Sequence, residues 1–188
     1  MKKLSLLAVT LFISTLISCG GGAGKQPANA KGFSEIEKEL KSKFGDNAYF
    51  TDISIIHNKT IGNMISTTVT DAPESLAMGQ WTMSQGVWNQ TSDITLEIPE
   101  GTKAADFMFQ LDDKINLSKL GGLIEKSKEQ LTAEKNIENP SLTMAHIYFP
   151  KNGDVSKAEY YVKLEPENGG TTFTFSYTLD GELIKMDY

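Results

Sequence analysis

The spacing of apolar residues predicts a first helix. One stripe of that helix would consist of residues three or four positions apart, namely Phe33, Ile36, Leu40 and Phe44. Ser34 and Glu37 have the Ser-x-x-Glu spacing of a capping box, in which the hydroxyl and the carboxylate satisfy amides of the first turn. We therefore expect the helix to begin at Ser34 and to end at Gly45.

From Tyr49 onward the pattern becomes strand-like and is rich in Ile, Thr and Val. The expected strands cover residues 49–56, 60–70, 80–90 and 93–98, and Gln85-Gly86 would form a tight turn within the third. The segment 99–117 is ambiguous. Its aromatic residues alternate as in a strand, whereas 104–106 would also suit a short helix, so its structure stays open.

A second helix is expected after this segment, with Ser118 as its cap and Asn139-Pro140 as its end. Its apolar face would consist of Leu120, Leu123, Ile124 and Leu131. Gly121-Gly122 lies within this helix and lacks the Lys-Ser/Thr of a phosphate loop. Close packing of the helix on the sheet is the simpler explanation for the two glycines.

Four further strands are predicted at 142–149, 158–165, 171–178 and 182–187. Asp180-Gly181 favours a type I′ turn between the last two. With that turn, one face of the hairpin would carry Phe173, Phe175, Tyr177, Ile184, Met186 and Tyr188. We therefore expect one buried and one solvated face.

This order of elements indicates an α+β fold, with one or two antiparallel sheets covered by two helices. A helix followed by four strands occurs twice, in 33–98 and 118–188, with 99–117 as the connection. The order resembles folds built from tandem helix-plus-four-strand units, such as the beta-lactamase inhibitor protein and the peptidase-propeptide or cystatin-like modules. The resemblance implies a binding or inhibitory module. It lies in the order of elements only, so it identifies no functional residue in this chain. A sheet with two covering helices also arises without duplication, so both interpretations stay open.

The N-terminus has the layout of a secretory signal. Lys2 and Lys3 precede an apolar run over 4–17 that is too short to span a bilayer, which takes about 20 residues. The run ends in Leu16-Ile17-Ser18-Cys19, which contains the only cysteine of the chain. Two simple interpretations of Cys19 are that it lies near a plain signal-peptidase site, or that it is a buried cysteine of a cytosolic protein.

Leu-Ile-Ser-Cys resembles the lipobox of bacterial lipoproteins. The resemblance implies removal of residues 1–18, a diacylglyceryl thioether on Cys19 and fatty acylation of the new amino terminus. Two or more acyl chains hold a protein stably on a bilayer, whereas one does so only marginally. Gly20 is not the Asp that resembles an inner-membrane retention signal, so we expect an outer-membrane anchor facing the periplasm in a host with two membranes.

Residues 19–32 would be a flexible tether, since they are rich in Gly and have little to bury. Thirteen residues of such a chain reach about 20 Å in root-mean-square terms. The α+β domain would then comprise 33–188 and stand clear of the lipid.

The composition excludes several classes of function. Removal of residues 1–18 leaves 16 Lys against 24 acidic residues, a net charge of −8, and the chain has no arginine. Such a surface repels nucleic acid and lacks the guanidinium fork that binds phosphates and carboxylates in bidentate fashion. With Cys19 lipidated, no thiol remains for a disulfide or a metal.

Few residues suggest catalysis. His57 and His146 are the only histidines, and no metal-binding motif or Gly-x-Ser-x-Gly elbow accompanies them, so we expect no metal or other cofactor. The carboxylate pairs Asp112-Asp113 and Glu165-Pro166-Glu167 do not follow a calcium-loop pattern. Solvated loops are the simpler interpretation of both.

Trp81, Met83 and Trp88 would share one face of the hairpin around Gln85-Gly86. They would be core residues if a helix covers that face, and a rigid ligand platform if the face is open. The leading hypothesis is thus an anchored, non-catalytic envelope module that binds a protein, a peptide or a cell-wall ligand. The alternative is a lipid-anchored hydrolase or other enzyme whose site residues are dispersed along the chain.

Overall fold

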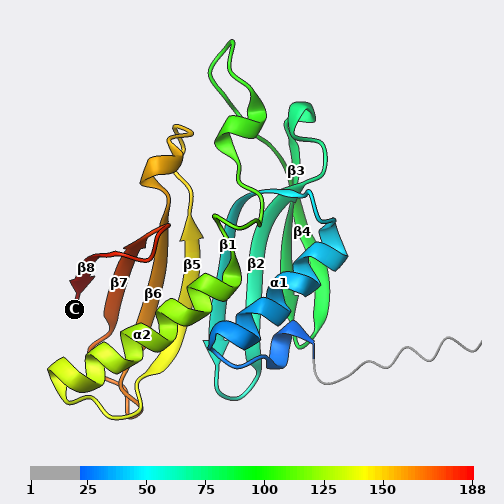
Figure 1. Cartoon of the computed structure of the whole chain (residues 1–188). Coiled ribbons are helices and arrows are strands. Elements are labelled where there is room, and N and C mark those ends of the chain that lie inside the picture. Colours follow the sequence, from blue (N-terminus) through cyan, green and yellow to red (C-terminus); the bar gives the residue numbers. More distant parts are fainter. Residues whose placement is uncertain (1–21) are drawn as a thin grey trace, which may run out of the picture.

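A computed structural model describes residues 22–188, which form an eight-stranded antiparallel sheet and two long helices (Figure 1). The helices are α1 (Ala30–Phe44) and α2 (Leu117–Lys135). The strands are β1 (Tyr49–Asn58), β2 (Gly62–Thr70), β3 (Ala77–Ser84), β4 (Val87–Thr95), β5 (Ser141–Tyr148), β6 (Glu159–Glu165), β7 (Phe173–Thr178) and β8 (Leu183–Asp187). Their order in the sheet is β4-β3-β2-β1-β5-β6-β7-β8, which confirms the predicted α+β class.

The two halves of the chain join at the centre of this sheet. Each half contributes a helix followed by four strands, and the first strand of each half lies innermost. β1 and β5 pair through four residues each, from Ile53 opposite Ile147 to Ile56 opposite Met144. The expected element order is therefore present in both halves, which share one sheet.

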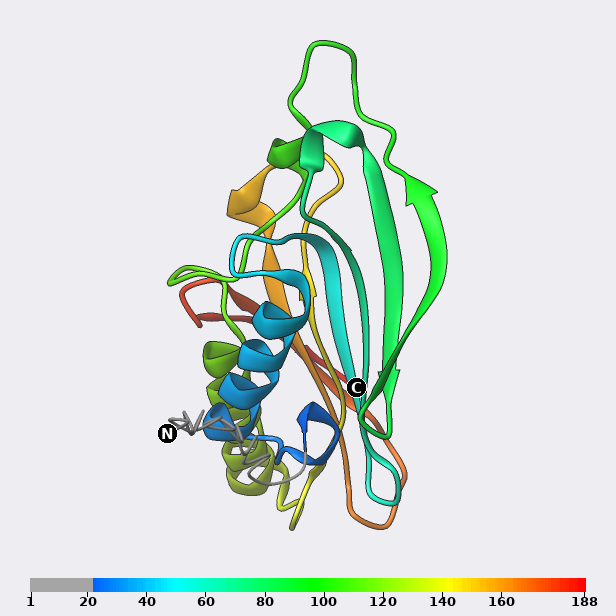
Figure 2. The same cartoon turned by 90° about the vertical axis from the view of Figure 1, so that its right-hand side faces the viewer.

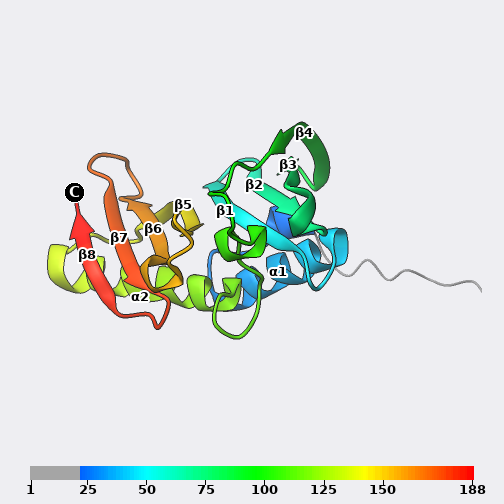
Figure 3. The same cartoon turned by 90° about the horizontal axis from the view of Figure 1, so that it is seen from above.

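Both helices pack on the same face of the sheet, and Figures 2 and 3 show them side by side on one side of it. Burial alternates along the strands, as in β6, where Tyr160, Val162 and Leu164 are fully buried and the residues between them are not. The main core lies between this covered face and the helices. The opposite face, which we call the open face, is covered by neither α1 nor α2.

The first helix begins earlier than the capping box predicts. Asn29 caps α1, because its side-chain oxygen accepts a hydrogen bond from Gly32 N at 2.8 Å. Glu37 instead accepts hydrogen bonds from Leu117 N, at 2.8 Å, and from Lys41 Nζ, at 2.7 Å. Gly45 ends the helix as expected, with a φ of +100°.

Residues 22–29 are packed against the domain, which corrects the expectation of a flexible tether up to residue 32. Ala23, in the 3₁₀ helix η1 (Ala23–Lys25), is 2% exposed and belongs to the core. Asn63 Nδ2 donates hydrogen bonds to the carbonyls of Ala23 (2.9 Å) and Gln26 (2.8 Å). Residues 1–21, which include the predicted signal peptide and Cys19, lie outside the described part of the chain.

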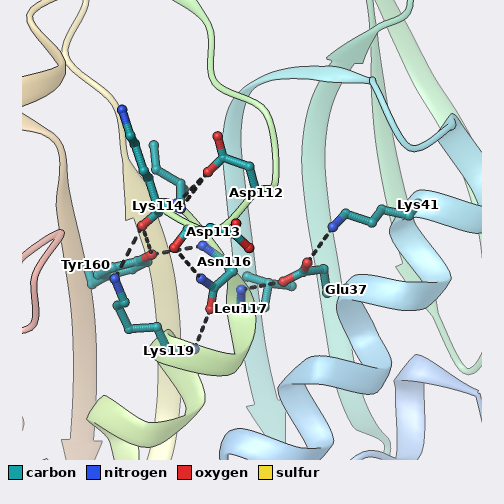
Figure 4. A network of polar contacts seen from close by, with 10 residues as sticks. Glu37, Lys41, Asp112, Asp113, Lys114, Asn116, Leu117, Lys119 and Tyr160 are labelled. Atoms are coloured by element: carbon teal, nitrogen blue, oxygen red, sulfur yellow. Dashed lines mark hydrogen bonds and ion pairs between the residues drawn. The ribbon is translucent and has the colours of Figure 1, made fainter.

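A polar junction links the two helices (Figure 4). Glu37 of α1 lies at the N-terminus of α2, where a carboxylate is stabilised by the unpaired amides and by the helix dipole. Asn116, rather than Ser118, caps α2 by accepting from Lys119 N at 2.8 Å. The hydroxyl of Tyr160 accepts from Asn116 N at 3.0 Å, and burial raises the pKa of Tyr160 to about 12.

The end of α2 and the role of its glycines also differ from expectation. Asn136, in the left-handed conformation, ends the helix before Asn139-Pro140 is reached. A Cβ on Gly121 would lie 2.4 Å from the Asn29 carbonyl oxygen, whereas one on Gly122 would meet nothing within 4 Å. Gly121 therefore allows α2 to approach the start of α1, and close packing on the sheet is not its reason.

Two strand predictions need correction. The expected strand 93–98 does not exist as such, because β4 ends at Thr95. In the last hairpin, a register shift between Ser176 and Tyr177 turns Ile184 outward, and it is exposed although the alternation predicts it in the core. The bulge explains the error, since one extra residue reverses the facing of the chain beyond it.

The ambiguous segment forms a cap over one end of the sheet. It contains the 3₁₀ helix η3 (Ala104–Phe107), and Phe109 then pairs with Phe50 of β1. Ala104 and Met108 pack with Met78 of β3 in a small second core. Met78 and Met83 are five residues apart along β3 and point to opposite faces, so this second core lies on the open-face side of the sheet.

Candidate functional site

The centre of the open face carries a group of apolar and aromatic side chains from β1, β2, β5 and β6. We call it the central patch and define it by Ile56, Met64, Met144, His146, Tyr148 and Tyr161. Ile56 lies between Met64 and Met144 across the sheet, and His146 lies opposite Tyr161. Ile56 is 42% exposed and Tyr148 is 43% exposed. The patch therefore presents apolar surface to solvent at the seam between the halves.

Three rings form the aromatic part of the central patch. The rings of His146 and Tyr161 stack with centroids 4.6 Å apart and planes 3° apart. Tyr148 meets Tyr161 edge-on at 6.1 Å. Neighbouring strands hold all three, so the rings are fixed before any ligand arrives and lose little freedom on binding.

A cleft of about 500 Å³ adjoins the central patch on the side of the cap. Its lining includes Asp52, Leu96, Glu97, Phe107, His146 and Tyr148. Leu96, Glu97 and Phe107 come from the segment between β4 and α2, and the others come from β1 and β5. Lys151 also lines the cleft, so the site offers groups of both charges beside apolar walls and suits a partly apolar ligand with polar groups.

His146 is held in its neutral form. Desolvation by the surrounding residues lowers its pKa, and the negative charge of Asp52 opposes this effect without reversing it. A neutral imidazole stacks on a phenol ring without bringing a charge into a half-buried position. The site is therefore uncharged at His146 near neutral pH.

His57 lies in a different environment, where it helps to hold the N-terminal segment. Its Nδ1 is 2.7 Å from Oδ1 of Asn63, the residue whose amide binds the Ala23 and Gln26 carbonyls. Within residues 22–188 no group of three or more His, Cys, Asp or Glu side chains could hold a metal ion. The two histidines thus belong to two separate parts of the fold.

Trp81, Met83 and Trp88 share one face, as the hairpin predicts, but α1 covers that face. Met83 is fully buried, and Phe44 of α1 meets the rings of Trp81 and Trp88 at centroid distances of 5.5 and 5.3 Å. Trp88 Nε1 donates a hydrogen bond to Glu39 at 3.0 Å, and Lys43 Nζ lies 4.4 Å from the Trp81 ring centroid. The three side chains are therefore part of the core region. They do not form an open ligand platform, because α1 covers the face that carries them.

The carboxylate pairs lie at turns, and Asp112 shapes one of these turns. Asp112 accepts hydrogen bonds from Lys114 N (2.8 Å) and Ile115 N (2.9 Å), which folds the turn before α2. Glu165 ends β6, and Pro166 begins the turn that follows, closed by Gly169 N and the Pro166 carbonyl at 3.0 Å. Both pairs lie away from the cleft.

The sequence contains one signal for the central patch that periodicity alone does not single out. In the strand 142–149, Ala145 and Ile147 face the core, whereas His146 and Tyr148 face the other way. A strand that faces solvent on one side normally carries polar residues on that side. Apolar or aromatic residues on both sides therefore indicate that both faces make contacts. The partners Asp52 and Tyr161 are added only by the register of β1 and β6.

Comparison with known proteins gives no relative: no protein-family model, no curated protein and no solved structure matches the chain. Among the residues that the structure describes, neither helix has the length and apolar character needed to cross a membrane. The predicted lipobox at Cys19 lies outside the described residues.

Proposed function

We propose that this protein is a lipid-anchored, non-catalytic module of the bacterial cell envelope that binds a protein or peptide on its open face. The observation that carries the binding role is the central patch with its cleft, on a sheet whose other face holds the core. Contiguous apolar surface with fixed rings and a polar rim is typical of interaction sites.

The surroundings of the histidines support binding rather than hydrolysis. A hydrolytic histidine has to reach a nucleophile and an orienting carboxylate through hydrogen bonds. Here His57 pairs with the amide of Asn63, and His146 stacks on Tyr161. Both rings thus have partners that suit a structural or recognition role.

The membrane anchor is the second part of the proposal, and the Leu16-Ile17-Ser18-Cys19 motif supports it. Mass spectrometry of the mature protein tests it directly. We expect a chain that begins at Cys19 and carries the mass of fatty acyl chains. A chain that still begins at Met1, or a free thiol at Cys19, would contradict the anchor.

The binding role is tested with a soluble fragment that starts at Gly22, because Ala23 is part of the core. The fragment captures partners from an envelope extract, beside the variants Tyr148→Ala and Tyr161→Ala. We expect both variants to lose a captured protein that the unchanged fragment retains, because truncating a ring at the centre of an interface costs about 2 kcal/mol or more.

Tyr188→Ala is the matched control, because this tyrosine is exposed and lies outside the central patch. The control should capture the same protein as the unchanged fragment. Capture that is equal for all four proteins would show that the central patch is not the binding surface. Hydrolysis of an envelope component that depends on His146 would favour the enzyme alternative instead.

A further inference from the structure

The docked N-terminal segment leaves very little chain between the predicted lipid anchor and the folded body. Three peptide steps separate Cys19 from Gly22, and a fully extended chain spans at most about 3.6 Å per residue, or about 11 Å in total. This distance is roughly half the reach of about 20 Å expected of a free tether of thirteen residues. The body would therefore stay close to the bilayer.

Several contacts fix the segment where it is. Asn63 is fully buried and binds two carbonyls of the segment. A Cβ on Gly62, whose φ is +82°, would lie 2.1 Å from the Gly24 carbonyl oxygen, so only glycine allows this approach. A Cβ on Gly24 would in turn lie 3.3 Å from Gly86 N in the β3–β4 turn. Gly22 is thereby held beside the turns β1–β2 and β3–β4.

These two turns and the docked segment form one corner of the molecule, which we call the anchor corner. It comprises residues 22–27, 57–62 and 84–88, and a hollow of about 410 Å³ between Gly22, Ile61 and Gly86 lies within it. Figure 1 shows the two turns at the end of the sheet opposite the cap, next to the start of the described chain. Any membrane that holds Cys19 would meet this corner first.

The composition of the anchor corner suits a lipid surface. It contains Lys25 and Lys59, in a chain whose formal net charge is −6. The Glu39 carboxylate of α1 contacts the corner and accepts hydrogen bonds from Ala23 N and Trp88 Nε1. Two apolar side chains project from it, with Val87 58% exposed and Ile61 38% exposed. Lysines attract anionic headgroups, and apolar side chains beside them enter the interface.

The neighbouring turns limit the extent of this surface. At the same end of the sheet, the second half carries Glu138, Glu165 and Glu167, which anionic headgroups repel. The contact is therefore confined to the corner contributed by the first half. The cleft lies next to the cap, at the opposite end of the sheet.

We infer that the anchor corner rests on an anionic bilayer, so that the short connection to Cys19 sets the orientation of the protein and turns the cleft away from the membrane. This inference rests on the proposed lipidation of Cys19. It adds a second membrane contact, made by the folded body itself, and a fixed direction for the binding site.

The test uses the full chain, produced in bacteria with its own signal and reconstituted into vesicles of phosphatidylethanolamine and phosphatidylglycerol. A single thiol is introduced as Val87→Cys at the corner, as Glu100→Cys in the cap, or as Glu167→Cys at the same end in the second half, and carries a fluorescent label. Since the Cys19 sulfur would be in a thioether, only the new thiol reacts. All three positions are exposed.

We expect quenching of the Val87→Cys label by a lipid-soluble quencher, with a several-fold loss of quenching by iodide relative to the Glu100→Cys and Glu167→Cys labels. Insertion of about 12 Gly/Ser residues between Gly20 and Gly21 adds a reach of about 20 Å and should make the three labels equally accessible. Vesicles of neutral lipid should weaken the shielding of Val87→Cys.

The outcomes separate the two proposals. Mass spectrometry that shows an unmodified Cys19 would overturn the anchor and the contact together. A lipidated Cys19 with equal iodide quenching at the three labels would overturn the contact and leave the anchor intact. Shielding that is unchanged by the insertion would overturn the role of the short connection.

Discussion

Neighbouring residues of β1 have opposite surroundings. Ile55 pairs with Ile65 of β2, and both are fully buried in the core, whereas Ile56, the next residue, is 42% exposed on the open face. The same contrast runs through β5, where Ile147 is buried and Tyr148 is 43% exposed. The covered face supplies the stability of the fold, which leaves the side chains of the open face available for recognition.

Truncation of an isoleucine should lower the free energy of unfolding far more on the covered face than on the open face, and this is the largest effect that we expect. Ile65→Ala should lower the free energy of unfolding by about 3 kcal/mol, because it removes buried methyl groups and leaves a cavity. Ile56→Ala on the open face should cost about 0.5 kcal/mol. Urea denaturation of the fragment 22–188 measures both, and similar costs would show that the open face is packed.

The buried amide of Asn63, on the covered face, should contribute nearly as much to the free energy of unfolding. Asn63→Ala should cost about 2 kcal/mol, because it leaves the carbonyls of Ala23 and Gln26 without the amide that binds them. Asn89→Ala, at an exposed position of β4, is the matched control and should be close to neutral. Rapid hydrogen exchange across residues 22–29 in the Asn63 variant would confirm release of the segment. Unchanged exchange would contradict the docking role.

The polar junction between α1 and α2 should contribute less to the free energy of unfolding. Glu37→Gln keeps an acceptor for Leu117 N but removes the charge that favours the α2 N-terminus, so we expect a loss of about 0.5–1 kcal/mol. Glu35→Gln is the control, since Glu35 forms an exposed ion pair with Lys38. The thermal midpoint of each variant gives the comparison, and added salt should reduce the Glu37 effect.

Acidification should reveal the smallest effect, on the open face. Because desolvation lowers the pKa of His146 in the folded protein, the unfolded chain takes up this proton first as the pH falls below about 6.5. The contribution of neutral His146 is thus complete above that pH and is lost as the pH falls through the lowered pKa. His146→Gln should reduce the loss of stability between pH 7 and 5, as measured by denaturation at each pH. An identical pH profile in the variant would contradict the neutral, stacked histidine.

Alternation and turn residues predict much of the fold, because they are local. The strands from Tyr49 to Thr70 and from Ser141 to Asp187 appear close to their expected bounds. The capping-box spacing gives the wrong start for α1, since Asn29 caps the helix and Ser34 lies within it. The docking of Ala23 depends on Asn63, forty residues away, and nothing in the composition of the segment signals that contact.

The candidate site, too, is predictable from local sequence only in part. The outward facing of His146 and Tyr148 can be derived from the alternation of one strand. The stack on Tyr161 and the cleft beside Leu96 require the register of β6 and the path of the cap, which are set by tertiary packing. The hairpin predicts that Trp81 and Trp88 share a face, but only the position of α1 decides that this face is covered.

The short seam between β1 and β5 has a consequence for how the chain folds. It consists of four residue pairs, whereas the β1–β2 hairpin has nine, and it joins residues as distant as Ile53 and Ile147. Closing such a long loop costs more entropy than closing a hairpin and yields fewer contacts. We therefore expect the hairpins of each half to form first and the seam to close last. Ile147→Val should then speed unfolding and leave the refolding rate nearly unchanged, and slower refolding would place the seam in the nucleus.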